Sequence, residues 1–196
     1  AGGVGNPAVP YSLVNDKATA GLCSKPTERY YKSPTNEPMI LLGYTEQQLI
    51  LAEGVVRGWI SGDDKAYYES AVRASFEFYR TYASEVAAYL GEDAADTYLK
   101  GNEVVYDSSL PIEKKIERIA MQKYLPTFLQ GGVWLPYYEA LRTGYPDFRR
   151  APGVQLPYRW MYPQSEYNNN TANVQAALES QFGGGDKTSD KPWWLQ

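Results

Sequence analysis

The sequence predicts a mainly α-helical protein, in which helical hairpins are accompanied by an irregular, loop-rich part. First, apolar residues recur at helical spacing in residues 45–60, 67–82 and 112–120. Second, a short turn rich in Gly and Asp joins the first two of these segments, as in helices that fold back on one another. Third, Gly and Pro are frequent before residue 39 and prolines return after residue 145, which predicts extended chain in both places.

Residues 1–38 are predicted to be a loop-rich N-terminal stretch, and residues 39–196 a helical region that ends in an extended closing segment and a tail. Gly, Pro, Asn and Ser recur at short intervals in the first stretch, which fits loops and leaves room for a short strand. Residues 1–10 lack the positive charge and the apolar run of a signal peptide, so we expect a mature or truncated chain.

The first predicted helix begins at Thr45, because Thr45 and Gln48 have the spacing of a capping box. Its apolar face consists of Leu49, Ala52, Val56, Trp59 and Ile60. Residues 61–64 break this helix and supply a new N-cap, after which the second helix runs to Tyr82. Because the turn is so short, the two helices should pack antiparallel.

Small residues on these two helices should let their backbones approach closely, with larger side chains filling the remaining gaps. The small residues are Ala52, Gly54, Ala71 and Ala74, and the larger ones are Trp59 and Tyr68. The pair is similar to a tetratricopeptide-type hairpin, of which one unit is visible.

A second hairpin is predicted further along the chain. A strongly amphipathic helix starts at Pro111 and should kink or end at Pro126. The short helix that follows, in residues 133–144, tolerates Pro136 in its first turn, and Gly144 suits the left-handed position after its end.

The segment RWMYPQSEYNNN (residues 159–170) concentrates aromatic side chains, amides and opposite charges. In a structural interpretation, its asparagines cap a helix near Thr171, while Arg159 and Glu166 hold the segment over the last hairpin by charged hydrogen bonds. In a functional interpretation, the same amides and aromatics bind a polyol. The tail poses a similar choice, since the tryptophans at 193–194 fit a groove of their own domain or a sugar-stacking platform.

The composition favours a protein that binds a neutral ligand. A formal net charge of −4 provides no basic field for nucleic acid, and no apolar run is long enough to cross a bilayer. Without His and with one Cys, the chain lacks the usual metal ligands and catalytic triads, so we expect no metal or cofactor. The 18 Tyr and 5 Trp suit half-wet surfaces such as sugar sites, although helix packing explains any single tyrosine more simply.

The remaining route to catalysis is a pair of carboxylates that face each other across a sugar. The acids considered are Asp63, Asp64, Glu92, Asp93, Asp147 and Glu166. The pairs at 63–64 and 92–93 lie where helix N-caps are expected, and Asp147 follows a Tyr-Pro turn. Structural roles therefore account for these acids without any catalysis.

Five segments, taken in order, resemble the C-terminal portion of the SusD/RagB family of the Bacteroidota, over about residues 37–196. They are LILAEGVVRGWISGDDKAYYESAVRAS, KIERIAMQKYLPTF, EALRTGYPDF, LPYRWMYPQSEYNNNTANVQAAL and GGGDKTSDKPWW. The resemblance implies tetratricopeptide-like helix pairs with an irregular, loop-rich subdomain, and a binding protein rather than an enzyme. It also implies a longer protein, whose N-terminal region and lipid-bearing cysteine lie outside this chain.

By this resemblance, the protein is a surface-exposed lipoprotein of the outer membrane that captures glycans or other nutrients. Its implied partner is a TonB-dependent, SusC-like transporter, on which it lies as a lid. Tyr30 and Tyr31, in the irregular N-terminal stretch, are the candidate carbohydrate-binding residues. Two alternatives stay open: a helical scaffold that binds only another protein, and an all-α glycoside hydrolase.

Overall fold

The computed structural model describes residues 11–23, 26–132 and 134–195, and within these ranges the chain forms helices and no strand. The predicted mainly α fold is therefore confirmed. By its internal contacts the chain divides into two compact units, Leu22–Phe148 and Ala1–Gly21 with Arg149–Gln196. The predicted division at residue 38 concerns loop content and stays a prediction. The expectation about a signal peptide falls on residues 1–10, outside the described residues.

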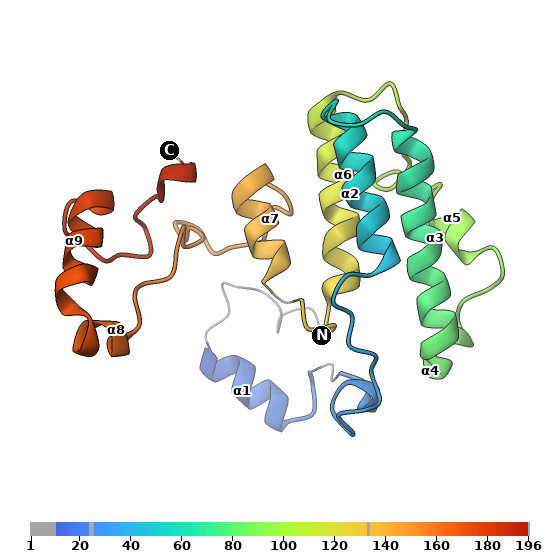
Figure 1. The fold of residues 1–196 in the computed structure, drawn as a ribbon. Helices are drawn as coiled ribbons and strands as arrows, with labels where there is room; N and C mark the ends of the chain where they lie inside the picture. Colours follow the sequence, from blue (N-terminus) through green and yellow to red (C-terminus); the bar gives the residue numbers. More distant parts are fainter. Residues whose placement is uncertain (1–10, 24–25, 133, 196) are drawn as a thin grey trace. The chain divides into compact units, whose positions relative to one another are not determined.

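Three long helices stand side by side in the Leu22–Phe148 unit (Figure 1). They are α2 (Tyr44–Val56), α3 (Asp64–Tyr82) and α6 (Ile112–Tyr124). The first two form the predicted antiparallel hairpin, and α6 packs on α2. The other elements of this unit are η1 (Glu28–Tyr30), α4 (Ser84–Ala87), α5 (Ala94–Tyr98), η2 (Leu125–Thr127) and α7 (Leu135–Thr143). α4 and α5 lie against α3, and α7 packs on α6 as the predicted second hairpin.

The long helices share one buried core. Its members include Leu49, Ala52, Tyr68, Ala71, Val72 and Ile119. The Tyr68 ring lies 4.6 Å from the Tyr106 ring, centroid to centroid, and its hydroxyl donates to the carbonyl oxygen of Val104 at 2.8 Å. Because a buried tyrosine needs a partner for its hydroxyl, this bond fixes the loop before α6 against α3.

The hairpin helices approach closely at Ala52 and Ala71, as predicted, because both residues are fully buried. The prediction that Trp59 fills a gap between the two helices is wrong. Trp59 lies beyond the end of α2, is 70% exposed, and has its ring 5.4 Å from the Arg57 guanidinium. Gly54 was predicted to allow a close approach to α3, but it makes room for a different residue. A Cβ atom at this position would lie 3.2 Å from the side chain of Ile60.

The predicted helix ends are mostly confirmed. α6 ends at Tyr124, just before the turn that contains Pro126, and Gly144 ends α7 with a left-handed φ of 83°. Asp63 caps α3, since its carboxylate accepts from the Ala66 amide at 2.9 Å. The capping box at Thr45 is wrong: α2 starts one residue earlier, after Gly43, without a side-chain cap.

Replacement of Asp63 by Ala is expected to lower the free energy of unfolding by about 1 kcal/mol, because the Ala66 amide loses its acceptor. Urea unfolding followed by circular dichroism measures this loss. Asp63→Ser keeps an oxygen at the cap and should recover most of the stability. Equal stability of the Ala and Ser variants would show that the cap contributes nothing.

The other unit contains α1 (Tyr11–Thr19), α8 (Gln164–Asn169), α9 (Thr171–Phe182) and η3 (Trp193–Leu195). α1 was not expected in a stretch of loops, and α8 falls inside the RWMYPQSEYNNN segment, whereas the helix predicted near Thr171 is confirmed. α8 packs on α9, and Val174 and Leu178 of α9 are buried. Trp193 is largely exposed, so its predicted docking in a groove is not observed.

The closing segment is held within its own unit by Asp186. Arg159, expected to pair with Glu166, instead donates to the Asp186 carboxylate at 2.5 Å, and its guanidinium lies 4.4 Å from the Phe182 ring centroid. Asp186 also accepts from the Tyr167 hydroxyl at 2.6 Å. The asparagines do not cap α9 through their side chains. These contacts favour the structural interpretation of the segment, and its predicted position over the last hairpin stays a prediction.

Candidate ligand-binding site

Tyr30 and Tyr31 lie at the end of η1, in two different environments. Tyr31 is 65% exposed, so one face of its ring is open to a ligand. Tyr30 is half-buried against Tyr79. Burial, helped by the neighbouring Tyr79 hydroxyl, raises the pKa of Tyr30 to about 12, so its phenol stays neutral and can donate or accept hydrogen bonds. The structure thus places the two tyrosines together, with Tyr31 as the accessible one.

A buried arginine holds the tyrosine loop in place. Arg29 donates to the backbone carbonyl oxygen of Tyr82, at the end of α3, and forms an ion pair with Glu37, with one nitrogen-to-oxygen distance of 2.8 Å. Glu37 also accepts from the side-chain amide of Gln130. A buried charge requires such partners, and these fix η1 between α3 and the chain after η2. Sequence reasoning missed this arrangement, because its partners are far apart in the chain.

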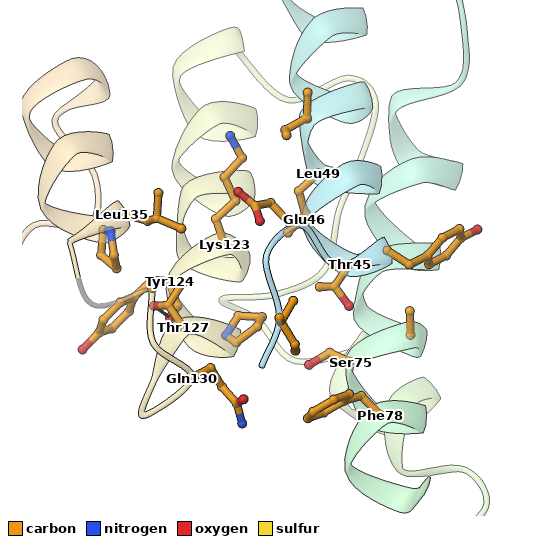
Figure 2. A pocket seen from close by; sticks show the side chains of 18 of the residues that line it. Thr45, Glu46, Leu49, Ser75, Phe78, Lys123, Tyr124, Thr127, Gln130 and Leu135 are labelled. Carbon is orange, nitrogen blue, oxygen red and sulfur yellow. Dashed lines mark hydrogen bonds between the residues drawn. The ribbon is translucent and has the colours of Figure 1, made fainter. Parts of the chain in front are cut away.

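An apolar groove with a volume of about 270 Å³ lies among α2, α3, α6 and α7, all in the same unit. Its apolar wall includes Ile40, Leu41, Ile50, Phe78, Tyr124 and Leu135. Figure 2 shows Thr45, Glu46 and Leu49 of α2 and Ser75 and Phe78 of α3 on one side, with Lys123 and Tyr124 of α6 facing them. The wall of the groove is mainly apolar, with a few polar side chains such as Thr45, Ser75 and Gln130.

The buried Glu53 of α2 binds three cationic side chains, one of which, Lys123, lines the groove. Its carboxylate accepts from Arg57 at 2.7 Å, from Lys123 at 2.8 Å, and from Arg142 at 2.6 and 2.9 Å. Burial alone would raise the pKa of Glu53, but the hydrogen bonds from these cations lower it to about 2. The cluster ties α2 to α6 and α7 and neutralises the Lys123 charge beside the groove.

Two of the carboxylates considered for catalysis, Asp63 and Asp64, have structural partners. Asp63 caps α3, and Asp64 accepts from Lys115, Tyr106 and Ser108 at 2.8–3.2 Å. Burial opposes ionisation of Asp64, yet these donors lower the pKa of its carboxyl group. In the part of the chain that the structure describes, no three metal-binding side chains come together. Among the same residues, no helix has the length and apolarity needed to span a membrane.

The fold and these sites define a helical binding protein, with an exposed tyrosine loop and an apolar groove. Comparison with known proteins identifies the particular class. A family model described as "Starch-binding associating with outer membrane" matches residues 3–163, so the chain belongs to the SusD-like family. The match starts well before residue 37, and therefore includes both candidate tyrosines. No curated protein matches the chain significantly.

Solved structures support the same assignment. A crystal structure of an outer membrane protein from Bacteroides vulgatus, described in connection with nutrient binding, is 77% identical, with a TM-score of 0.89, and the match covers 97% of this chain and 42% of that one. A SusD homologue from Bacteroides fragilis is 51% identical, with a TM-score of 0.87. The match covers 98% of this chain and 42% of the homologue. A chitin-binding protein is 27% identical, with a TM-score of 0.62. The match covers 78% of this chain and 32% of that protein.

The chain thus spans about two fifths of the length of these two Bacteroides structures, 42% in each case. The resemblance to SusD-like proteins, the helical fold and the outer-membrane association of the family are confirmed by these matches. The family is one of nutrient-binding, non-catalytic proteins. The tail, beyond residue 163, is covered by the solved structures although the family model stops before it.

Proposed function

We propose that the chain is part of a surface lipoprotein that binds glycans or other nutrients without altering them, and passes them to a TonB-dependent, SusC-like transporter. The observation that carries the proposal is the match over 97% of the chain to an outer membrane protein linked to nutrient binding. The starch-binding description of the family and the chitin-binding relative favour a neutral oligosaccharide as ligand.

The tyrosine loop is the proposed carbohydrate contact. Tyr31 offers an open aromatic ring, and Tyr30 supplies a neutral hydroxyl beside it. Sugars present apolar faces next to hydroxyl groups, so a ring with an adjacent hydrogen-bonding group matches their chemistry. The ion pair of Arg29 and Glu37 keeps the loop in one conformation, which reduces the entropy lost on binding.

Replacement of Tyr31 by Ala is expected to weaken oligosaccharide binding at least about tenfold, equivalent to about 1.4 kcal/mol, because the stacking surface is lost. The measurement is calorimetric titration of the longer protein that contains this chain with starch and chitin oligosaccharides. Tyr30→Ala should also weaken binding, through the lost hydroxyl and a looser loop.

Tyr89 provides a matched control, since it is 87% exposed and lies in the turn between α4 and α5. Tyr89→Ala should leave the affinity unchanged, and Tyr31→Phe should retain most of it. Unchanged affinity in Tyr30→Ala and Tyr31→Ala together would remove the loop from the binding site. The nutrient-binding function would then rest on another part of the protein.

One observation favours the alternative of a helical scaffold that binds only other proteins: the open apolar groove. Co-purification with a barrel transporter, without affinity for any oligosaccharide tested, would support the scaffold. The glycoside hydrolase alternative is disfavoured, because the family is non-catalytic and the adjacent acids Asp63 and Asp64 both have structural partners.

A further inference from the structure

A second hollow, polar rather than apolar, lies between α3 and α5, which pack against each other in the same unit (Figure 1). Its volume is about 400 Å³, within the range of about 300–1,000 Å³ that is usual for ligand pockets. Its wall combines the ring of Tyr44 with charged side chains of both signs, namely Arg73, Glu77, Arg80, Glu92 and Asp96. None of these charged residues lines the apolar groove, so the hollow is a separate feature of the unit.

Two arginines of α3 hold the walls of the hollow together. Arg80 donates to the backbone carbonyl oxygens of Gly91 and Glu92, at 3.2 Å for Glu92. Arg73, two turns earlier on the same face of the helix, pairs with the Asp96 carboxylate of α5 at 2.9 Å. Because both contacts join α3 to the segment around α5, the hollow has its shape before a ligand arrives, which limits the entropy lost on binding.

The charged side chains of the hollow keep hydrogen-bonding capacity for a ligand. The Glu92 carboxylate forms no hydrogen bond or ion pair among the residues that the structure describes. Arg73 and Asp96 pair with each other, yet their side chains are 49% and 56% exposed. A guanidinium has five N–H donors and a carboxylate accepts at about four positions, so the pair saturates neither group. The hollow therefore offers donors and acceptors side by side.

An aromatic ring forms one side of the hollow. Tyr44, the first residue of α2, is 58% exposed, and its hydroxyl oxygen lies 3.3 Å from the hydroxyl oxygen of Ser70 on α3. This hydrogen bond orients the ring beside the charged row of α3, while the residue stays more than half exposed. A tyrosine in such a half-wet position presents an apolar ring face as well as a polar hydroxyl.

The charge of the hollow selects the class of ligand. Two cations, Arg73 and Arg80, line it together with three carboxylates, those of Glu77, Glu92 and Asp96, so two positive and three negative charges give −1. No positive field is left for phosphate, sulfate or carboxylate groups. An uncharged sugar ring fits, because its hydroxyls donate to carboxylates and accept from guanidinium groups, and its apolar face packs on an aromatic ring.

We propose that the hollow between α3 and α5 is a second carbohydrate site, which takes one uncharged sugar ring of an oligosaccharide. The sugar stacks on Tyr44, and its hydroxyls form hydrogen bonds with Arg73 and Glu92. This inference rests on the proposed function, that the longer protein binds neutral oligosaccharides, and it adds a site that shares no residue with the tyrosine loop. A long glycan is then held at two points, and a short one at either.

Fluorine NMR of the longer protein that contains this chain tests the second site. Tyr44 is replaced by 3-fluorotyrosine, which keeps the ring and the hydroxyl, and the protein is titrated with short starch and chitin oligosaccharides. The fluorine signal at position 44 should shift and saturate, and should still do so when Tyr31 is replaced by Ala. 3-Fluorotyrosine in place of Tyr89, which is 87% exposed and does not line the hollow, is the matched control and should not shift.

Removal of one acceptor measures what the hollow contributes. Glu92→Gln should weaken the binding that is reported at position 44 about tenfold, because a charge-assisted hydrogen bond from a sugar hydroxyl is lost. The affinity reported by 3-fluorotyrosine at position 31 should stay the same. Glu113→Gln, at an exposed position on α6 that does not line the hollow, should change neither affinity.

The signals at positions 31 and 44 separate this inference from the proposed function. A shift at position 31 without one at position 44 would overturn the second site and leave the proposed function intact. A shift at position 44 that disappears in Tyr31→Ala would also overturn the second site, because the signal would then be relayed from the tyrosine loop. No shift at either position, with no heat of binding, would overturn both.

Discussion

Replacement of Glu53 by Gln is expected to lower the free energy of unfolding of the helical unit by about 3 kcal/mol, because it removes the buried carboxylate of the cluster and leaves Glu139 alone to neutralise Lys123 and Arg142. Lys123 and Arg142 both donate to the Glu53 carboxylate, at 2.8 Å and 2.6 Å, and Lys123 is itself largely buried. A neutral amide accepts fewer hydrogen bonds than a carboxylate and brings two N–H donors against these cations. The loss should appear as a lower midpoint in urea unfolding.

Glu77→Gln is the matched control. Glu77 lies on α3, and its carboxylate is 3.5 Å from Arg80 in an exposed pair. Pairs of this kind contribute about 0–1 kcal/mol, so the control should unfold nearly as the parent protein does. If the two variants were equally stable, the Glu53 cluster would have no special role in joining α2 to α6 and α7.

The pH dependence of stability is a second test of the Glu53 cluster. The pKa of Glu53 is lowered from 4.5 in an unfolded chain to about 2 in the folded protein, so the folded state binds its proton less readily. The stabilisation from this group is therefore complete above about pH 5 and is lost as the pH falls from 4.5 towards 2. In Glu53→Gln, this part of the acid sensitivity should disappear.

The second large effect is expected at Tyr68. Its side chain is fully buried, lies against Tyr106, and donates to Val104. Tyr68→Ala opens a cavity between α3 and the loop before α6, and should cost about 3–5 kcal/mol of stability. Tyr68→Phe keeps the ring but leaves the Val104 carbonyl oxygen without its donor, and should cost about 1–3 kcal/mol.

Urea unfolding of both variants, with Tyr89→Phe as an exposed control, separates ring packing from the hydrogen bond. A loss in Tyr68→Phe as large as that in Tyr68→Ala would mean that the hydroxyl, rather than the ring, holds the loop. A change of less than about 1 kcal/mol in Tyr68→Ala would contradict the placement of this residue in the core.

Local features of the fold could be predicted from the sequence. The Asp63 cap, the end of α6 before Pro126 and the left-handed Gly144 depend on residues within a few positions, where backbone chemistry decides the conformation. The hairpin of α2 and α3 follows from periodicity and a short turn. Trp59 was wrongly assigned to the apolar face of α2, because the helical spacing of apolar residues continues past Val56, where α2 ends.

Contacts between distant residues could not be predicted in the same way. Glu53 lies 70 positions from Lys123 and 89 from Arg142, and nothing in the local sequence of any of them marks the pairing. Arg159 was assigned to a nearby acid, Glu166, but binds Asp186, 27 positions away. For the candidate site, the tyrosines could be named from their type and setting, whereas the groove required helices from four places in the chain to come together.

Gln130 belongs to two neighbourhoods at once. Its amide nitrogen donates to Glu37, the partner of Arg29 in the tyrosine loop, and its side chain also forms part of the groove wall. A ligand in the groove that moved the Gln130 side chain would therefore also change the support of the tyrosine loop. Linkage makes such an effect reciprocal, because a sugar that steadies the loop would change the affinity of the groove for that ligand by the same factor. Binding at the groove and binding at the loop would then be coupled through a single amide.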